Sequence, residues 1–316
     1  MEGRRGRVLE TTEGDRTMLT EHQTRRGGET STVNMGTLTA DAVPSLNRTL
    51  QFRRSFTTGT RMAAVAGHGT LRGKVALVSG ASHGIGRAIA MDLAREGASV
   101  VVNYCTSHLE AESLCTRLRA EGGVAYPVGS DVADAAACNQ MVEEALAEFG
   151  RIDILVNNAG VRSDAPFHTM HRHQWDAVMR TNLDGIYNLT RATINPMRQR
   201  GYGRIVFITE TSLRLGAAAH TNLTASKMAI AGLARGLAEE NARLGITVNC
   251  VCPGVIETRR LERFTPEERD QILSRIPLGR FGHAEEVANL VRFLVSDNAA
   301  YITGQEFHID GGLSLT

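Results

Sequence analysis

Apolar runs of strand length recur along residues 71–316, and stretches with helical spacing separate them. The runs of strand length are Val75–Val78, Val100–Val102, Val124–Val128, Ile152–Val156, Ile205–Ile208, Ile246–Val251 and Glu306–Ile309. The helical stretches are Arg87–Glu96, Leu109–Arg119, Ala135–Phe149, Trp175–Arg198, Ala225–Arg243 and Ala284–Val295. Strands that alternate with helices predict right-handed βαβ units and a parallel sheet. The pattern therefore predicts one doubly wound α/β domain with a seven-stranded parallel sheet and helices on both faces.

Residues 1–70 lack this periodicity and are rich in Thr, Arg and Gly. Such a segment buries too little apolar surface to offset the entropy of ordering it. It lacks the apolar stretch that a secretory signal peptide requires. Its acidic residues argue against an organelle transit peptide, because such peptides contain few of them. We expect a disordered N-terminal extension. A start codon at Met35 or Met62 and a partner-binding arm are the alternatives.

The composition excludes several functional classes. Net charge is +1 and aromatic residues make up 5%, which disfavours nucleic acid as a partner. No run of eighteen apolar residues predicts a membrane span. The five cysteines have no paired C-x-x-C spacing, so neither a disulfide framework nor a structural zinc site is indicated, and a cytoplasmic protein is expected.

A glycine-rich loop follows the first predicted strand. It reads Gly80-Ala81-Ser82-His83-Gly84-Ile85-Gly86 and opens into the first helix. Glycine lets the backbone turn tightly and approach a pyrophosphate, and the helix N-terminus supplies free N–H groups. This placement predicts a dinucleotide site, the alternative being a turn that binds no ligand.

The loop has the spacing G-x-x-x-G-x-G, and further motifs follow it in order. Asn157-Asn158-Ala159-Gly160 follows the fourth strand, Pro253-Gly254 follows the sixth, and Tyr301-Ile302-Thr303-Gly304 precedes the end of the chain. With these motifs, residues 71–316 resemble the short-chain dehydrogenase/reductase superfamily, and most closely its 3-oxoacyl-acyl-carrier-protein reductase branch. The resemblance implies a Rossmann-type domain, a nicotinamide cofactor and a carbonyl or hydroxyl substrate.

The resemblance also implies which residues bind the cofactor. They are Gly80, Ser82, His83, Gly84, Ile85, Gly86, Asn103, Asp131, Val132, Asn157, Ala159, Gly160, Lys227, Pro253, Gly254, Ile256 and Thr258. The second strand ends in Asn103-Tyr104-Cys105-Thr106 without the carboxylate that would bind the ribose 2′-hydroxyl of NAD. NADP is therefore predicted over NAD, although His83 is only a weak, pH-dependent cation in the loop.

The catalytic pattern of the superfamily is broken in this chain. Lys227 and the upstream Asn182 are present, and Lys227 is one of only two lysines. Four residues before Lys227, where the family has its proton-donating tyrosine, stands Leu223, and the family's serine position is Glu210. Leucine donates no proton, so a conventional reductase step is in question.

Three interpretations follow. In the first, hydride transfer continues with a substitute acid, either Glu210 held protonated by burial or His220, with Thr224 and water as further candidates. In the second, Glu210 and Lys227 perform redox-neutral acid–base chemistry, such as isomerisation or dehydration. In the third, the protein is a non-catalytic scaffold in which Glu210 and Lys227 form an ion pair.

Other candidate groups carry less chemistry. His168, His171 and His173 lie close together but lack an evident carboxylate or cysteine partner, so no metal site is predicted. Cys250 and Cys252 alternate on one strand and are expected to be buried thiols.

Substrate and assembly follow from the resemblance alone. Residues 257–283 occupy the place of the family's mobile substrate lid. The substrate would be a small molecule or an acyl thioester, with acyl-carrier protein as a possible partner. Helices at 174–200 and 219–243 would form one contact and the last strand another, which implies a homotetramer.

Overall fold

The computed structural model describes residues 69–211 and 218–315. Of the predicted N-terminal extension, residues 1–70, all but the last two lie outside the described ranges. The chain divides into two units, Met1–Ala63 and Ala64–Thr316, and the described residues all belong to the second. In these ranges no helix is both long and apolar enough to cross a membrane.

One seven-stranded sheet runs through the second unit, and every strand pair in it is parallel. The strands are β1 (Val75–Val78), β2 (Ser99–Tyr104), β3 (Val124–Gly129), β4 (Ile154–Asn157), β5 (Gly203–Ile208), β6 (Ile246–Pro253) and β7 (Glu306–Ile309). Their order is β3-β2-β1-β4-β5-β6-β7, which confirms the predicted doubly wound fold. The order reverses between β1 and β4, and ligands of such sheets bind beyond the carboxyl ends of the strands at this point.

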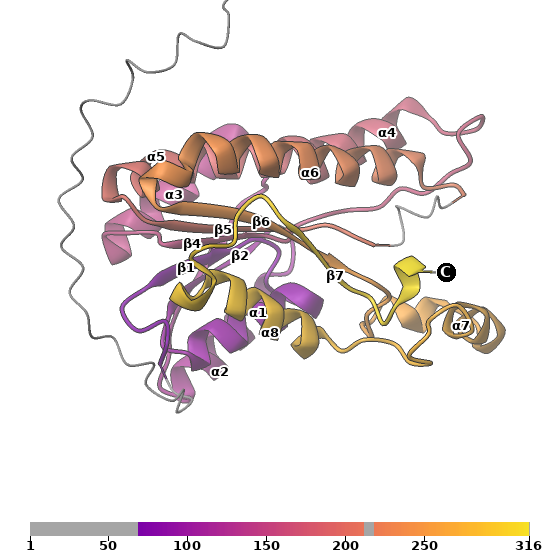
Figure 1. Ribbon diagram of the computed structural model, residues 1–316, viewed down its shortest axis with the longest axis horizontal. Helices are drawn as coiled ribbons and strands as arrows, with labels where there is room; N and C mark the ends of the chain where they lie inside the picture. The colour runs from indigo at the N-terminus through magenta and orange to yellow at the C-terminus, as the bar shows by residue number, and fades with distance from the viewer. Residues whose placement is uncertain (1–68, 212–217, 316) are drawn as a thin grey trace, which may run out of the picture. The chain divides into compact units, whose positions relative to one another are not determined.

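Helices cover both faces of the sheet (Figure 1). The helices are α1 (Gly84–Arg95), α2 (His108–Ala120), α3 (Ala135–Phe149), α4 (Arg172–Met179), α5 (Gly185–Arg200), α6 (Thr221–Asn241), α7 (Pro266–Leu273) and α8 (Ala284–Val295). One core joins α1, α2 and α8 to one face, and a second joins α3, α5 and α6 to the other. Alternate residues of β1 enter different cores, because successive side chains of a strand point to opposite faces.

The predicted helix Trp175–Arg198 is helical throughout but is not one α-helix. Residues Arg180–Asp184 form a π-helical turn between α4 and α5. The side chain of Asn182, in this turn, hydrogen-bonds both backbone groups of Val161. Its Nδ2 atom donates to the Val161 carbonyl over 3.0 Å, and its Oδ1 atom accepts from the Val161 N–H over 2.8 Å. A π-turn is rare and occurs mostly at functional sites, and hydrophobic spacing does not reveal it.

The segment placed in the lid region by resemblance contains its own small core. The 3₁₀ turn Leu261–Arg263 and α7 pack through a cluster of Leu261, Ile276, Phe281 and Leu313. Thr265 caps α7 by accepting from the backbone N–H of Glu268, and Pro266 begins the helix. The segment is thus more ordered than its polar sequence suggests.

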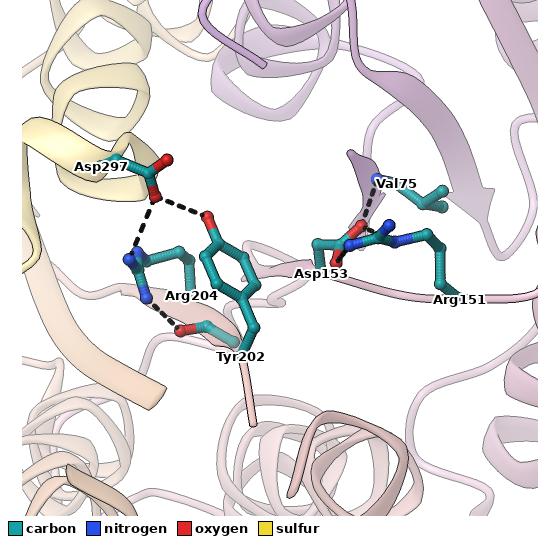
Figure 2. A network of polar contacts seen from close by, with 7 residues as sticks. Val75, Arg151, Asp153, Tyr202, Arg204 and Asp297 are labelled. Atoms are coloured by element: carbon teal, nitrogen blue, oxygen red, sulfur yellow. Dashed lines mark hydrogen bonds and ion pairs between the residues drawn. The ribbon is translucent and has the colours of Figure 1, made fainter. Parts of the chain in front are cut away.

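The amino-terminal edge of the sheet is held by two polar clusters, which Figure 2 shows side by side. The carboxylate of Asp153 is fully buried, accepts from the Val75 N–H over 2.9 Å and pairs with Arg151. The Tyr202 ring lies between the Lys74 ammonium, 3.5 Å from its centroid, and the Arg204 guanidinium, 4.4 Å from it. Burial raises the pKa of Tyr202 to about 12, and its hydroxyl donates to Asp297 over 3.2 Å. These clusters connect the beginnings of β1, β4 and β5.

We expect Asp153→Asn to destabilise the fold by about 2 kcal/mol, because it leaves Arg151 without its charge partner and gives up a charge-assisted bond to the Val75 N–H. Urea unfolding measures the change. Asp176→Asn is the matched control, since Asp176 pairs with Arg172 on the surface of α4, and about 0.5 kcal/mol or less is expected there. Equal losses in the two variants would show that the buried pair is not special.

Candidate active site

The glycine loop turns between β1 and α1 at the point where the strand order reverses. Gly80 and Gly84 have φ values of 60° and 57°, which side chains rarely adopt. A Cβ on Gly86 would lie 2.4 Å from both the Asn158 Nδ2 atom and the Gly80 carbonyl oxygen, so no side chain fits there. The N-terminus of α1 has no side-chain cap and no acidic residue in its first turn, which leaves its N–H groups available to an anion.

The side chains of two asparagines hydrogen-bond the backbone of this loop. The Asn158 Nδ2 atom donates to the carbonyls of Ser79 and Gly80, each over 3.0 Å. The Asn103 side chain accepts from the Gly80 N–H over 3.2 Å and donates to the Ser130 carbonyl over 3.0 Å. Asn103 is buried and these bonds engage both ends of its amide, so the structure places it as a support beneath the predicted cofactor site.

The predicted adenosine side lies at the ends of β2, β3 and β4. Cys105 and Thr106 follow β2 and are exposed, and the ring of Tyr104 packs close against Gly129. Asp131 accepts from the Ala133 N–H over 2.9 Å, and the Val132 carbonyl accepts from Asn188. Asn157 is buried and donates to the Thr190 hydroxyl over 3.2 Å. In the glycine loop, the Ser82 hydroxyl lies 2.9 Å from His83 Nδ1.

The segment after β6 closes the opposite side. Gly254 lies so close to Asp310 that a Cβ would come within 2.7 Å of the Asp310 Cα atom. Ile256 forms an isolated bridge with Gly282. A Cβ on Gly84 would lie 3.7 Å from the Thr258 methyl group, so Thr258 adjoins the glycine loop. The two loops that the sequence assigns to one cofactor are therefore neighbours.

Lys227, a predicted catalytic residue, lies at the carboxyl ends of β4 and β5. Its Nζ atom donates to the Ile208 carbonyl over 2.7 Å, and a Cβ on Gly160 would lie 3.8 Å from the same atom. Burial lowers the pKa of Lys227 to about 8, against an opposing contribution from the charge of Glu210. The ammonium thus lies between the ends of β4 and β5.

Glu210 has a partner that the sequence analysis did not identify. The Arg162 Nη2 atom bonds both carboxylate oxygens of Glu210. Glu210 and Arg162 keep 20% and 22% of their side-chain surface exposed, so burial does not isolate the carboxylate. The Glu210–Lys227 ion pair of the scaffold interpretation is not among the ion pairs of the described residues, where Glu210 pairs with Arg162 and acts on Lys227 through its charge. Since Arg162 follows β4 and Glu210 follows the adjacent β5, a search for charges at neighbouring strand ends would have found the pair.

The first turn of α6 buries two side chains, Asn222 and Leu223. Leu223, at the family's tyrosine position, is buried against Val178 of α4. Asn222 beside it donates to the carbonyls of Ser163 and Gln174 over 2.8 and 3.2 Å, which ties α4 and the Arg162 segment to α6. Sequence reasoning missed Asn222, because nothing local marks its distant partners.

His220 caps the N-terminal end of α6. Its Nδ1 atom donates to the Ala218 carbonyl over 2.6 Å, and its Nε2 atom lies 3.3 Å from an Asp164 oxygen. His220 therefore sits at the rim of the site with both ring nitrogens engaged. Tyr202 is at the opposite edge of the sheet, so it cannot take the place of the missing tyrosine.

The remaining candidates are the histidines at the start of α4 and the two cysteines of β6. His171 and His173 stack with ring centroids 5.5 Å apart at the start of α4. Within residues 69–211 and 218–315, no three His, Cys, Asp or Glu side chains are grouped to hold a metal ion. Cys250 and Cys252 are buried in one core, as predicted, and Cys252 accepts from the Thr209 hydroxyl over 2.9 Å.

Comparisons with known proteins identify the family of the chain. The family described as enoyl-(acyl carrier protein) reductase matches residues 80–314. The 3-oxoacyl-[acyl-carrier-protein] reductases FabG of Staphylococcus aureus and Escherichia coli are each 42% identical to the chain over 243 residues, which is 77% of this chain and 98% of theirs. The FabG protein of Staphylococcus epidermidis is 41% identical over the same length.

We expect Lys227 to titrate near pH 8 instead of above pH 10. The chain has two lysines, so lysine labelled with ¹³C at the ε carbon gives two NMR signals, and Lys74→Arg assigns the one from Lys227. Glu210→Gln should move the midpoint lower, because the Glu210 charge favours the ammonium. A Lys227 titration midpoint above pH 10 in both the wild type and Glu210→Gln would contradict the burial of the Lys227 ammonium.

The same shift couples to stability. Between about pH 8 and 10.5 the unfolded chain keeps Lys227 protonated while the folded chain does not, so the unfolded state binds more protons and rising pH favours folding. Relative to Lys227→Met, the wild type should gain up to about 3 kcal/mol across this window and lose it as the pH falls to about 8. Urea unfolding at several pH values measures the difference.

Proposed function

The chain belongs to the short-chain dehydrogenase/reductase family, and on that premise we propose that it binds NADP(H) and reduces the carbonyl group of an acyl substrate. The observation that carries the proposal is the glycine loop around Gly86, where the absence of a Cβ and the uncapped end of α1 make room for a pyrophosphate. By analogy with the relatives, the substrate is a 3-oxoacyl thioester carried by an acyl-carrier protein or a smaller carbonyl compound.

The proposed cofactor contacts follow the two neighbouring loops. Ser82 to Gly86 would hold the phosphates, Asp131 and Asn157 the adenosine side, and Ile256 and Thr258 the nicotinamide side. NADP is preferred over NAD because no carboxylate stands between Asn103 and His108 to repel a 2′-phosphate. When bound, the reduced nicotinamide supplies a hydride to the carbonyl carbon.

The chain's own residues orient and polarise the substrate. Asn182 holds the Val161 backbone beside the site, and Lys227 presents a buried ammonium between two strand ends. With Leu223 at the tyrosine position, the proton must come from another group, and His220 at the rim and Glu210 remain the proposed donors. His220 reaches solvent more directly, whereas Glu210 would first have to leave Arg162.

Assembly and location are proposed from the same relationship. Tyr187 of α5 and Met228 of α6 are exposed apolar side chains, and Gly232 and Gly236 leave open space along α6. Such a face favours contact with a second copy through α5 and α6, and β7 offers a second edge. We propose a homotetramer in the cytoplasm.

The first test is nucleotide binding, read by NADPH fluorescence enhancement and by calorimetry. The wild type should bind NADPH more tightly than NADH. Gly86→Ala should lose at least about tenfold in affinity, because its methyl group would collide with Asn158 and the Gly80 carbonyl. Leu109→Ala is the control, since Leu109 is an exposed side chain of α2 outside the proposed site and contact face. Binding of neither nucleotide by the wild type would overturn the proposal and favour acid–base catalysis without a cofactor or a scaffold.

A second test restores the family's residues. Leu223→Tyr combined with Glu210→Ser should raise the rate of 3-oxoacyl thioester reduction, because a phenol donates the proton that leucine cannot. The single variants separate the two effects, and NADPH consumption measures the rate. If the double variant reduces such thioesters no faster than the wild type, the loss of the tyrosine is not what limits the reaction.

A further inference from the structure

The ends of β4 and β5 gather two cations around one carboxylate. Lys227 Nζ lies against Gly160 after β4 and bonds the carbonyl of Ile208, the last residue of β5. Two residues beyond each of these positions, Arg162 and Glu210 are joined by their ion pair. The charges of Arg162 and Glu210 both act on Lys227, so the three groups share one site.

Two hydroxyl groups in the described residues near this site bond to protein groups outside it. Thr209 donates to Val251 and Cys252, and Ser226 donates to the Leu223 carbonyl over 2.8 Å. An ionised Glu210 can only accept, and Leu223 has no polar group. In relatives with serine and tyrosine at these two positions, neutral hydroxyls would face the substrate oxygen, and this chain has none there.

Arg162 has donors to offer in their place. Among the described residues, the only nitrogen of its guanidinium with a hydrogen-bond partner is Nη2, which leaves Nη1 and Nε. The side chain is one-fifth exposed, so a small molecule can reach it. The Lys227 ammonium donates one of its three N–H groups to Ile208, and among residues 69–211 and 218–315 no partner takes the other two.

We propose that Arg162 and Lys227 form an oxyanion site, in which Glu210 acts as the positioning residue that orients the Arg162 guanidinium. The ligand class is a carbonyl oxygen that takes on negative charge, as in an alkoxide, an enolate or a phenolate. The identity of that oxygen as a substrate carbonyl rests on the proposed function, but the anion site itself does not.

The physical basis is the exchange of neutral donors for charged ones. A hydrogen bond from a cation to an anion is about twice as strong as one between neutral groups. The buried Leu223 and Val178 line the neighbouring wall and limit screening by water. Such a site binds the anionic form of a ligand more tightly than its neutral form. A pair of neutral hydroxyl groups would show a much smaller preference.

The test uses 4-nitrophenol as a probe, because its phenolate absorbs visible light and its phenol does not. Titration of the full-length protein without nucleotide should show that bound 4-nitrophenol ionises about one pH unit lower than free 4-nitrophenol, a tenfold preference for the phenolate. Arg162→Gln should abolish this preference while binding of the neutral phenol at low pH stays the same. Glu210→Gln should weaken the preference, since it frees the guanidinium to move.

Arg117→Gln is the matched control, because Arg117 forms an Arg–Glu ion pair with Glu121 on the surface of α2. It should leave the titration unchanged. If Arg162→Gln fails to fold, Arg162→Lys keeps the charge and should retain part of the preference. Equal affinity of the wild type for phenol and phenolate, or an unchanged preference in Arg162→Gln, would overturn the inference.

The two proposals fail in different ways. NADPH binding without phenolate preference would overturn the oxyanion site and leave the proposed function standing. Phenolate preference without nucleotide binding would overturn the proposed function and leave the oxyanion site standing.

Discussion

The active edge depends on the close contact between Gly86 and the side chain of Asn158. The Asn158 amide bonds the carbonyls of Ser79 and Gly80, which follow β1, and a Cβ on residue 86 in the first turn of α1 would overlap the amide. This contact brings the end of β4 to the glycine loop at the reversal of strand order. The contact between Gly86 and Asn158 therefore sets how far the glycine loop lies from the residues after β4, which include Gly160 and Arg162.

The two edges of the sheet divide stability and chemistry between them. At the amino-terminal edge, the buried Asp153 and the Tyr202 ring between two cations satisfy charges within the protein. At the carboxyl edge, the α1 N-terminus and the Lys227 ammonium keep donors that protein groups do not fully use. Parallel strands force this asymmetry, because all their carboxyl ends lie on one side.

The two positions where the resemblance expects serine and tyrosine hold a charged group and an apolar group. Leu223 packs against Val178 of α4, and Glu210 pairs with Arg162. On the proposal made above, such a site would work through charge where relatives with serine and tyrosine would use hydroxyls. The π-turn at Asn182 persists beside it and still holds the Val161 backbone, so the frame around the altered residues is intact.

The sequence by itself determined the sheet, the helices around it and the glycine loop after β1, because each depends on local periodicity or on glycine spacing. Ala135–Phe149 and Ala284–Val295 were predicted to the residue, since a regular apolar face marks both ends of a surface helix. That Leu223 stands at the tyrosine position is a prediction from the resemblance, obtained by counting back from Lys227. The tertiary structure alone decided the partner of Glu210, the π-turn at Arg180–Asp184 and the ties made by Asn222. The Glu210 and Asn222 contacts join residues far apart in the chain and leave no periodic trace in the sequence. The π-turn is local, but its apolar spacing is close to that of an α-helix, so the pattern does not reveal it.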